Sequence, residues 1–162
     1  MRVAELAERL QVSYRDVRYV LEQGILPRGV VKSPGRGEHR DLSNEQAFWL
    51  AIVLLLKRIG LQTPIAGEIA DLTRDSVRWF TQNLGAEHTF QPFTGQFETE
   101  NEWSVEIGDR QYYRIVSTAD HGFGGPNAWP WTDLRKRREA KNATPLVVVR
   151  LDLARLARLM TA

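Results

Sequence analysis

The feature that most constrains this chain is a stretch of ten apolar residues at positions 47–56, AFWLAIVLLL. Ser43 precedes it as a helix cap and Gly60 follows it as a helix stop, so we expect one helix from residue 43 to about residue 59. A membrane span needs roughly 18 apolar residues, and this stretch is too short. A helix that is apolar almost all round must therefore be buried on several sides by its own chain, or pair with a second chain.

The composition indicates a folded protein of one domain or two small ones, since 43% of its 162 residues are hydrophobic. The absence of cysteine excludes disulfides, thiolate metal sites and cysteine nucleophiles. The N-terminus alternates charged and apolar residues and lacks the uninterrupted apolar stretch of a signal peptide. We therefore expect a cytoplasmic protein with no membrane partner, no metal and no cofactor.

The net charge of the chain is only +2, but it is unevenly spread. Residues 1–60 carry +3, residues 61–108 carry −6, and residues 109–162 carry +5. Basic ends around an acidic middle suggest that the ends meet a polyanion. Chance clustering of surface charge would give the same distribution, so charge alone does not decide between the two.

The first forty residues have the pattern of two short helices followed by a basic hairpin. Apolar residues recur at helical spacing within residues 3–10, and Ser13 caps a second helix whose inward stripe lies within residues 17–21. Gly24 ends that helix, and residues 28–41, RGVVKSPGRGEHRD, mix proline and glycine with cations. This pattern predicts a winged helix-turn-helix, whose second helix enters the major groove of DNA while the hairpin, or wing, lies along the backbone or the minor groove.

The candidate DNA contacts are the polar residues that this arrangement turns outward. Arginine can bridge phosphates or read the edge of guanine, and tyrosine can bind a phosphate or pack on a sugar. The predicted DNA-binding residues are Ser13, Tyr14, Arg15, Arg18, Tyr19, Lys32, Arg36, His39 and Arg40. The plainer alternative is a solvated helix surface followed by an ordinary polar loop.

The order and spacing of these elements resemble the MerR-type transcriptional regulators. Residues 12–27, VSYRDVRYVLEQGILP, are similar to that family's V-S turn and its L-R-Y-Y-E-x-x-G-L-L pattern. Arg40 and Leu42 stand where its wing ends, and LLLKRIGLQTPIAGEIADL continues the likeness to about residue 72. The resemblance implies a sequence-specific transcriptional regulator that binds double-stranded DNA and is associated with the bacterial nucleoid.

The chain also departs from the family pattern. Val20 replaces the usual second aromatic residue, Leu42 replaces the wing tyrosine, and the long dimerisation helix of the family does not follow Gly85. We still expect a homodimer, because a single module of this size buries only about 600–1,000 Å² against DNA.

The remaining sequence predicts an α+β fold in two domains, 1–85 and 86–162. Two more helices are expected, one opened by Thr63 and Pro64 and the other ended by Gly85. Beyond residue 86 the helical period is lost.

Apolar residues then alternate from Trp103 onward, which predicts an antiparallel sheet with a hairpin turn at Gly108 and Asp109. Residues 146–151 predict a buried strand, and Asp152 caps a last helix. This C-terminal domain would serve dimerisation, effector sensing or contact with a partner protein.

The C-terminal domain holds two further candidate sites. A basic run could make a second phosphate contact or be the solvated start of a helix; it comprises Arg135, Lys136, Arg137 and Arg138. Five aromatic residues could form a small-molecule pocket or be the core and lid of a small sheet; they are Trp103, Tyr112, Tyr113, Trp129 and Trp131.

Three alternatives to a regulator follow from these features. Phage excisionases resemble the same winged module, which would make the chain an adaptor that shapes DNA and recruits a partner protein. The aromatic residues would instead suit a small-molecule sensor. An enzyme is not expected, because Asp120 and His121 lack an identifiable nucleophile and the nearby glycines lack the lysine of a phosphate-cradling loop.

Overall fold

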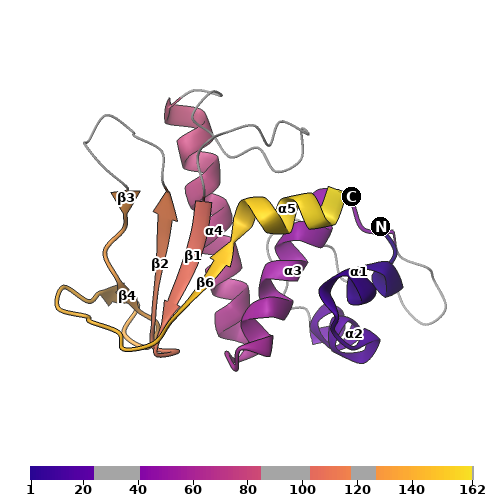
Figure 1. The fold of residues 1–162 in the computed structure, drawn as a ribbon, viewed down its shortest axis with the longest axis horizontal. Coiled ribbons are helices and arrows are strands. Elements are labelled where there is room, and N and C mark those ends of the chain that lie inside the picture. The colour runs from indigo at the N-terminus through magenta and orange to yellow at the C-terminus, as the bar shows by residue number, and fades with distance from the viewer. Residues whose placement is uncertain (24–40, 85–102, 118–126, 162) are drawn as a thin grey trace. The chain divides into compact units, whose positions relative to one another are not determined.

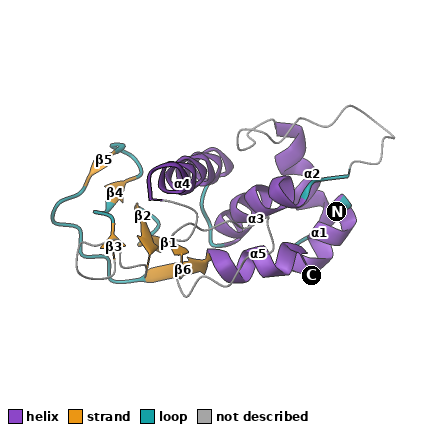
Figure 2. Cartoon of the chain, turned by 90° about the horizontal axis from the view of Figure 1, so that it is seen from above, coloured by secondary structure: helices purple, strands orange, loops and turns teal. Residues whose placement is uncertain are grey.

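We describe the protein from a computed structural model, which places residues 1–23, 41–84, 103–117 and 127–161 (Figure 1). Among these residues the elements are α1 (Val3–Leu10), α2 (Tyr14–Gln23), α3 (Asn44–Arg58), α4 (Thr63–Leu84), β1 (Trp103–Gly108), β2 (Tyr112–Ser117), β3 (Asn127–Ala128), β4 (Thr132–Asp133), β5 (Arg138–Glu139), β6 (Val148–Asp152) and α5 (Leu153–Thr161). Helices come first and strands later, with one closing helix (Figure 2), so the predicted α+β class is confirmed. None of the described helices combines the length and apolarity needed to cross a membrane.

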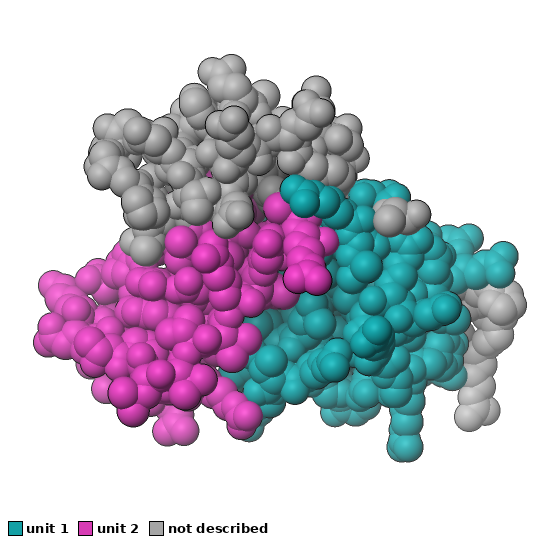
Figure 3. All heavy atoms as spheres, viewed as in Figure 1, with its two compact units in different colours: residues 1–74, 156–162 teal, residues 75–155 magenta. Residues whose placement is uncertain are grey.

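The chain divides into two compact units (Figure 3). Unit 1 contains residues 1–74 and 156–162, and unit 2 contains residues 75–155. The predicted domains, 1–85 and 86–162, differ from these units at both ends. α4 continues through the first boundary, and most of α5 belongs with the N-terminal helices.

α5 joins unit 1 through one apolar side and one backbone contact. Leu156 and Met160 are buried, and the Arg9 guanidinium of α1 donates a hydrogen bond to the Leu159 carbonyl at 2.8 Å. The predicted cap is confirmed, since the Arg155 amide donates to the Asp152 carboxylate at 2.8 Å. The C-terminal helix therefore completes the hydrophobic core that the N-terminal helices form.

α3 is the centre of unit 1. The Gln46 amide donates to the Ser43 hydroxyl at 3.1 Å, and the Ser43 amide donates to the Gln46 side chain at 3.1 Å, which is a reciprocal capping box. Nine of the fifteen residues of α3 are buried, and both α1 and α2 contact it. The predicted helix, buried on several sides by its own chain, is confirmed.

One helix, α4, stands where the sequence predicts two. The helical spacing of apolar residues is interrupted between Leu72 and Val77, which is why the sequence predicts a break there. No glycine or proline lies between residues 68 and 84, so the helix continues through this point. The buried Thr73 hydroxyl donates to the Ile69 carbonyl at 2.7 Å, which satisfies this polar group inside unit 1.

Unit 2 holds an antiparallel sheet with the strand order β5-β4-β2-β1-β6, and β3 also pairs with β2. The β1–β2 hairpin turns at Asp109 and Arg110, whose φ angles of 49° and 56° are those of a type I′ turn. The Gln111 amide closes it by donating to the Gly108 carbonyl at 2.9 Å. The predicted apolar alternation is confirmed, and its buried members in β1 are Trp103, Val105 and Ile107.

The prediction of a buried strand at residues 146–151 is wrong. β6 pairs with β1 alone among the described strands and lies at the sheet edge. Val148 and Val149 of β6 are 45% and 40% exposed, and the two residues before the strand, Leu146 and Val147, are 95% and 63% exposed. The Asp109 carboxylate accepts the backbone amides of Leu146 and Val147, at 3.0 and 2.9 Å, and so fixes the entry to the strand. An apolar run has the same composition at an edge as at the centre of a sheet, so periodicity cannot separate the two.

Met160→Ala should destabilise the protein by about 2–4 kcal/mol, because it opens a cavity where α5 closes unit 1. Leu159→Ala is the matched control on the same helix; Leu159 is 40% exposed, so its loss should cost less than about 1 kcal/mol. Denaturant unfolding measures both. Equal and small effects would show that residues 156–162 add nothing to the core.

Gly108→Ala should destabilise unit 2 by about 1–3 kcal/mol, because the new Cβ would lie 2.3 Å from Cγ of Pro145. The same substitution in a Pro145→Gly background should cost less, since the ring that it strikes is gone. Chemical denaturation of the four proteins of this cycle measures the coupling. Additive effects would contradict the proposed steric contact.

Candidate nucleic-acid interface

The turn between α1 and α2 is closed by hydrogen bonds on both sides. Gln11 adopts a left-handed φ of 52°, and the amides of Gln11 and Val12 donate to the last carbonyls of α1, each at 3.0 Å. Ser13 then caps α2 by accepting the Asp16 amide at 3.0 Å. With only Val12 between the two caps, the backbone itself sets the direction in which α2 leaves the turn.

The inner side of α2 is anchored in the core of unit 1. Val17 and Val20 are completely buried and Leu21 is 3% exposed, and the helix contacts both α1 and α3. Residues 14, 15, 18 and 19 lie within an arc of about 140° on the opposite side, at 100° per residue. The two tyrosines there are 51% and 46% exposed, and both arginines are exposed. We call this surface the α2 face; it consists of Tyr14, Arg15, Arg18 and Tyr19.

Arg18 of the α2 face forms an ion pair with Glu22, one helical turn further along. Both side chains are more than half exposed, at 53% and 55%. Such an exposed pair contributes only about 0.3–0.5 kcal/mol. A phosphate can therefore displace Glu22 as the partner of Arg18 at little cost.

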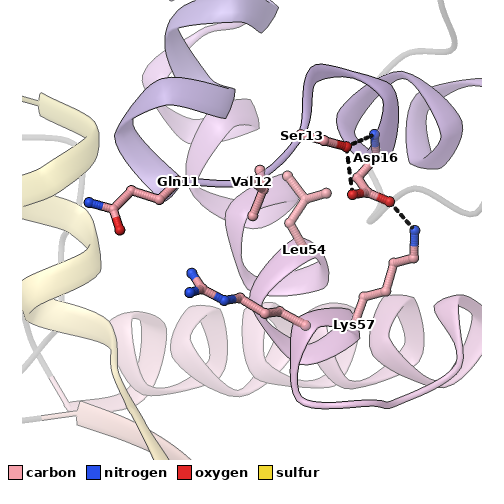
Figure 4. A pocket seen from close by; sticks show the side chains of 7 residues that line it. Gln11, Val12, Ser13, Asp16, Leu54 and Lys57 are labelled. Carbon is pink, nitrogen blue, oxygen red and sulfur yellow. Dashed lines mark hydrogen bonds and ion pairs between the residues drawn. The ribbon is translucent and has the colours of Figure 1, made fainter.

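Ser13 serves to position α2. Its hydroxyl proton is donated to the Asp16 carboxylate at 2.7 Å, so this group does not donate to a phosphate while the cap is intact. Lys57 of α3 donates to the other carboxylate oxygen of Asp16 at 2.9 Å (Figure 4). These hydrogen bonds, the one from Ser13 first, lower the pKa of Asp16 below its ordinary value.

These groups line a hollow of about 350 Å³ beneath the turn, which is lined by Gln11, Val12, Ser13, Asp16, Leu54, Lys57 and Arg58 (Figure 4). Its serine, carboxylate and ammonium groups already bind one another. The Arg58 guanidinium likewise donates to the Leu10 carbonyl at 3.4 Å. The hollow is best explained as the joint that ties α3 to the turn.

Lys57 is the functional candidate that sequence reasoning misses. Its ammonium lies 4.8 Å from the centroid of the Tyr19 ring, which adds a cation beside the α2 face. It is separated from Asp16 by 41 residues, so no local spacing connects the two. Only the packing of α3 on α2 brings them together.

The wing residues Lys32, Arg36, His39 and Arg40 lie outside the described residues. The chain that follows them returns to the start of α1. The Met1 ammonium donates to the Leu42 carbonyl and the Leu42 amide donates to the Met1 carbonyl, each at 2.8 Å, and Arg2 and Asp41 form an antiparallel bridge. The segment that contains the predicted wing therefore follows α2 in the chain and leads into this bridge, and both α2 and the bridge belong to unit 1.

The five aromatic residues do not come together in one pocket. Trp103 and Tyr113 lie on one face of the sheet and Tyr112 lies on the other, by the β1–β2 register. Trp129 stacks on Trp103, with ring centroids 6.1 Å apart, whereas Trp131 lies 4.3 Å from the Arg114 guanidinium on the opposite face. This split matches the alternative in which they form the core and lid of the sheet.

The basic run is not the start of a helix. Residues 134–137 form the turn of the β4–β5 hairpin, and Arg138 begins β5. The pair Asp120 and His121 lies outside the described residues. Within the described ranges no cluster of three or more histidine, aspartate or glutamate side chains could hold a metal ion.

Asp16→Asn should weaken the joint between α2 and α3 in a pH-dependent way. The pKa of Asp16 is lower in the folded protein than its ordinary 3.8, so its stabilising contribution is present above 3.8 and is lost as the pH falls through the lower folded value. Thermal unfolding of both proteins between about pH 7 and pH 2.5 should show a gap that closes below about pH 4. A gap independent of pH would mean that the carboxylate charge is not involved; Glu22→Gln serves as the exposed control.

Comparison with known proteins finds no matching family model, no matching curated protein and no matching solved structure.

Proposed function

We propose that this protein is a site-specific DNA-binding regulator of transcription that reads the major groove of duplex DNA with α2. The observation that carries the proposal is the α2 face. A helix follows a tight helix-turn-helix turn, its valine and leucine side is buried, and its tyrosines and arginines are exposed on the other side. The major groove, about 12 Å wide, admits an α-helix in this way.

The chemistry of the α2 face suits both parts of DNA recognition. Arg15 and Arg18 can bind phosphates or the O6 and N7 atoms of guanine, and the two tyrosines can bind phosphates or pack on sugars. Lys57 lies against the Tyr19 ring and is paired with Asp16, so its contribution is to hold that ring in place. The predicted wing at residues 28–41 would add cations along the backbone or in the minor groove.

The proposal includes a homodimer. One module of this kind buries about 600–1,000 Å² of its own surface against DNA, and two copies on paired half-sites raise affinity and specificity together. An adaptor of the excisionase kind would require a partner protein instead. A small-molecule sensor has less support, because the candidate aromatics are divided between two faces of the sheet, and we propose no catalytic role.

Arg15→Gln with Arg18→Gln should weaken binding to a duplex selected from random DNA by more than about 1 kcal/mol. The slope of log affinity against log salt should fall by about 1–2, since each neutralised phosphate contributes about 0.9. Fluorescence anisotropy over a salt series measures both quantities. Glu22→Gln should act in the opposite direction, because it removes an anion that competes for Arg18.

The charge-matched control is Arg78→Gln with Arg155→Gln, two exposed arginines of unit 2. It should leave both the affinity and the salt slope close to those of the wild type. Wild-type protein that selects no duplex, or an α2 double variant that binds as well as the control, would refute the proposal.

A further inference from the structure

We infer that the β4–β5 hairpin is a second nucleic-acid contact, a preformed basic tip that binds phosphodiester groups of the DNA backbone. The tip consists of Arg135, Lys136, Arg137 and Arg138. This inference rests on the proposed function and extends it to unit 2, which the helix-turn-helix does not include.

The tip is held rigidly by its own backbone. Asp133 is 5% exposed, and its carboxylate accepts the amides of Arg135 and Lys136 at 2.8 and 2.9 Å. The Arg137 amide donates to the Asp133 carbonyl at 2.7 Å, with a left-handed φ of 51° at Arg137. Little backbone entropy is therefore lost when a ligand binds the turn, and the remaining ordering cost is that of the arginine and lysine side chains.

Neighbouring contacts hold the base of the hairpin as well. Thr132 pairs with Glu139 and Asp133 pairs with Arg138 in the β4–β5 register. The Leu134 amide donates to the Gln111 carbonyl at 2.9 Å, and the Ala140 amide donates to the Trp131 carbonyl at 2.7 Å. The hairpin is thus closed across its own base, and it is attached to the rest of the sheet on the β4 side, through Leu134 and through the pairing of β4 with β2.

The charges of the hairpin point outward and are only partly compensated. All four cations of the tip are exposed, and Arg135, Lys136 and Arg138 have no ion pair with a carboxylate in the described residues. Residues 132–141 carry a net charge of +3. Of the two carboxylates in this range, that of Asp133 is occupied by the turn amides, which leaves Glu139 as the exposed one.

A hollow beside the tip can receive a phosphate group. Its volume is about 460 Å³, within the range of about 300–1,000 Å³ that small-ligand sites occupy. Its charged and polar lining residues are Tyr112, Asp133, Lys136, Arg138, Glu139, Lys141 and Asn142. The three cations and the Asn142 amide supply donors to phosphate oxygens, and arginine can do so in a bidentate manner.

The described surroundings favour DNA over a protein or a lipid surface. Protein interfaces have an apolar centre and membrane-binding segments carry apolar anchors, whereas the one apolar residue of the turn, Leu134, is only partly exposed. The exposed apolar residues of this unit, such as Leu146 and Val147, lead into β6, at the other edge of the sheet from the β4–β5 hairpin. Backbone phosphates need no such anchor, since arginine and lysine bind them through charge and hydrogen bonds.

The test compares two triple variants of the full chain. The tip variant is Arg135→Gln, Lys136→Gln and Arg138→Gln, which leaves the left-handed Arg137 and all turn amides in place. The control removes three other exposed cations by Arg78→Gln, Arg155→Gln and Arg158→Gln. Each protein is titrated by anisotropy into a labelled mixed-sequence duplex over about 50–200 mM salt. Thermal unfolding verifies that both variants are folded.

The tip variant should bind about tenfold more weakly, with a salt slope lower by about 2–3, while the control changes affinity less than about twofold. Equal losses in both variants would indicate a net-charge effect and overturn the inference. Wild-type affinity in the tip variant would overturn it too, and if Arg15→Gln with Arg18→Gln still weakens binding, the proposed function stands. The reverse pattern, loss at the tip and none at α2, would keep the hairpin contact and refute the role of α2. Wild-type protein that binds neither this duplex nor one selected from random DNA would refute both, whereas failure on the mixed-sequence duplex alone would overturn only the hairpin contact.

Discussion

The burial of α3 is the constraint on which unit 1 depends. Nine of its residues are buried, and burying a side chain such as Phe48 or Ile52 contributes roughly 1.5–3 kcal/mol. Exposing three of these side chains would cost a free energy comparable to the whole unfolding free energy of many domains, about 5–15 kcal/mol. α1, α2 and the end of α5 all belong to the unit that provides this cover. Hydrophobic packing therefore holds α2 in the direction that the turn gives it.

The polar groups around α2 divide into those that position it and those that remain available. Asp16 links the N-terminal cap to Lys57, whereas the Arg18–Glu22 pair is exposed and weak. Asp16 and Glu22 also offset the two arginines, so the helix carries no net charge. If α2 reads DNA, most of the electrostatic attraction must come from elsewhere on the chain. This would give the cations of the predicted wing and of the β4–β5 hairpin a physical purpose.

The sheet of unit 2 supports the β4–β5 hairpin, because β4 pairs with β2. Arg114 donates to Glu106 at 2.8 Å, and its guanidinium lies over the Trp131 ring. The cation beside this aromatic residue therefore already has partners within the protein. Trp131 also packs close to Gly108: a Cβ added at Gly108 would lie 3.3 Å from the Trp131 ring. These side chains hold the strand that leads into the basic hairpin. The aromatic residues thus have a structural explanation, and the exposed chemistry of this unit is mainly cationic and, at the edge strand β6, apolar.

Local order was decided by the sequence itself: Ser43 and Asp152 as caps, the stripe of α2, and the alternation of β1 all follow from residue spacing and side-chain chemistry within a few positions. These features need no distant partner, so they are readable in advance. Tertiary structure alone decided three others. Lys57 binds Asp16, 41 residues away in the sequence, and Arg9 of α1 binds Leu159 of α5, 150 residues away. The third feature is the position of the apolar strand β6 at an edge of the sheet. Their physical reason is shared, because each depends on which segments pack together after the chain has folded.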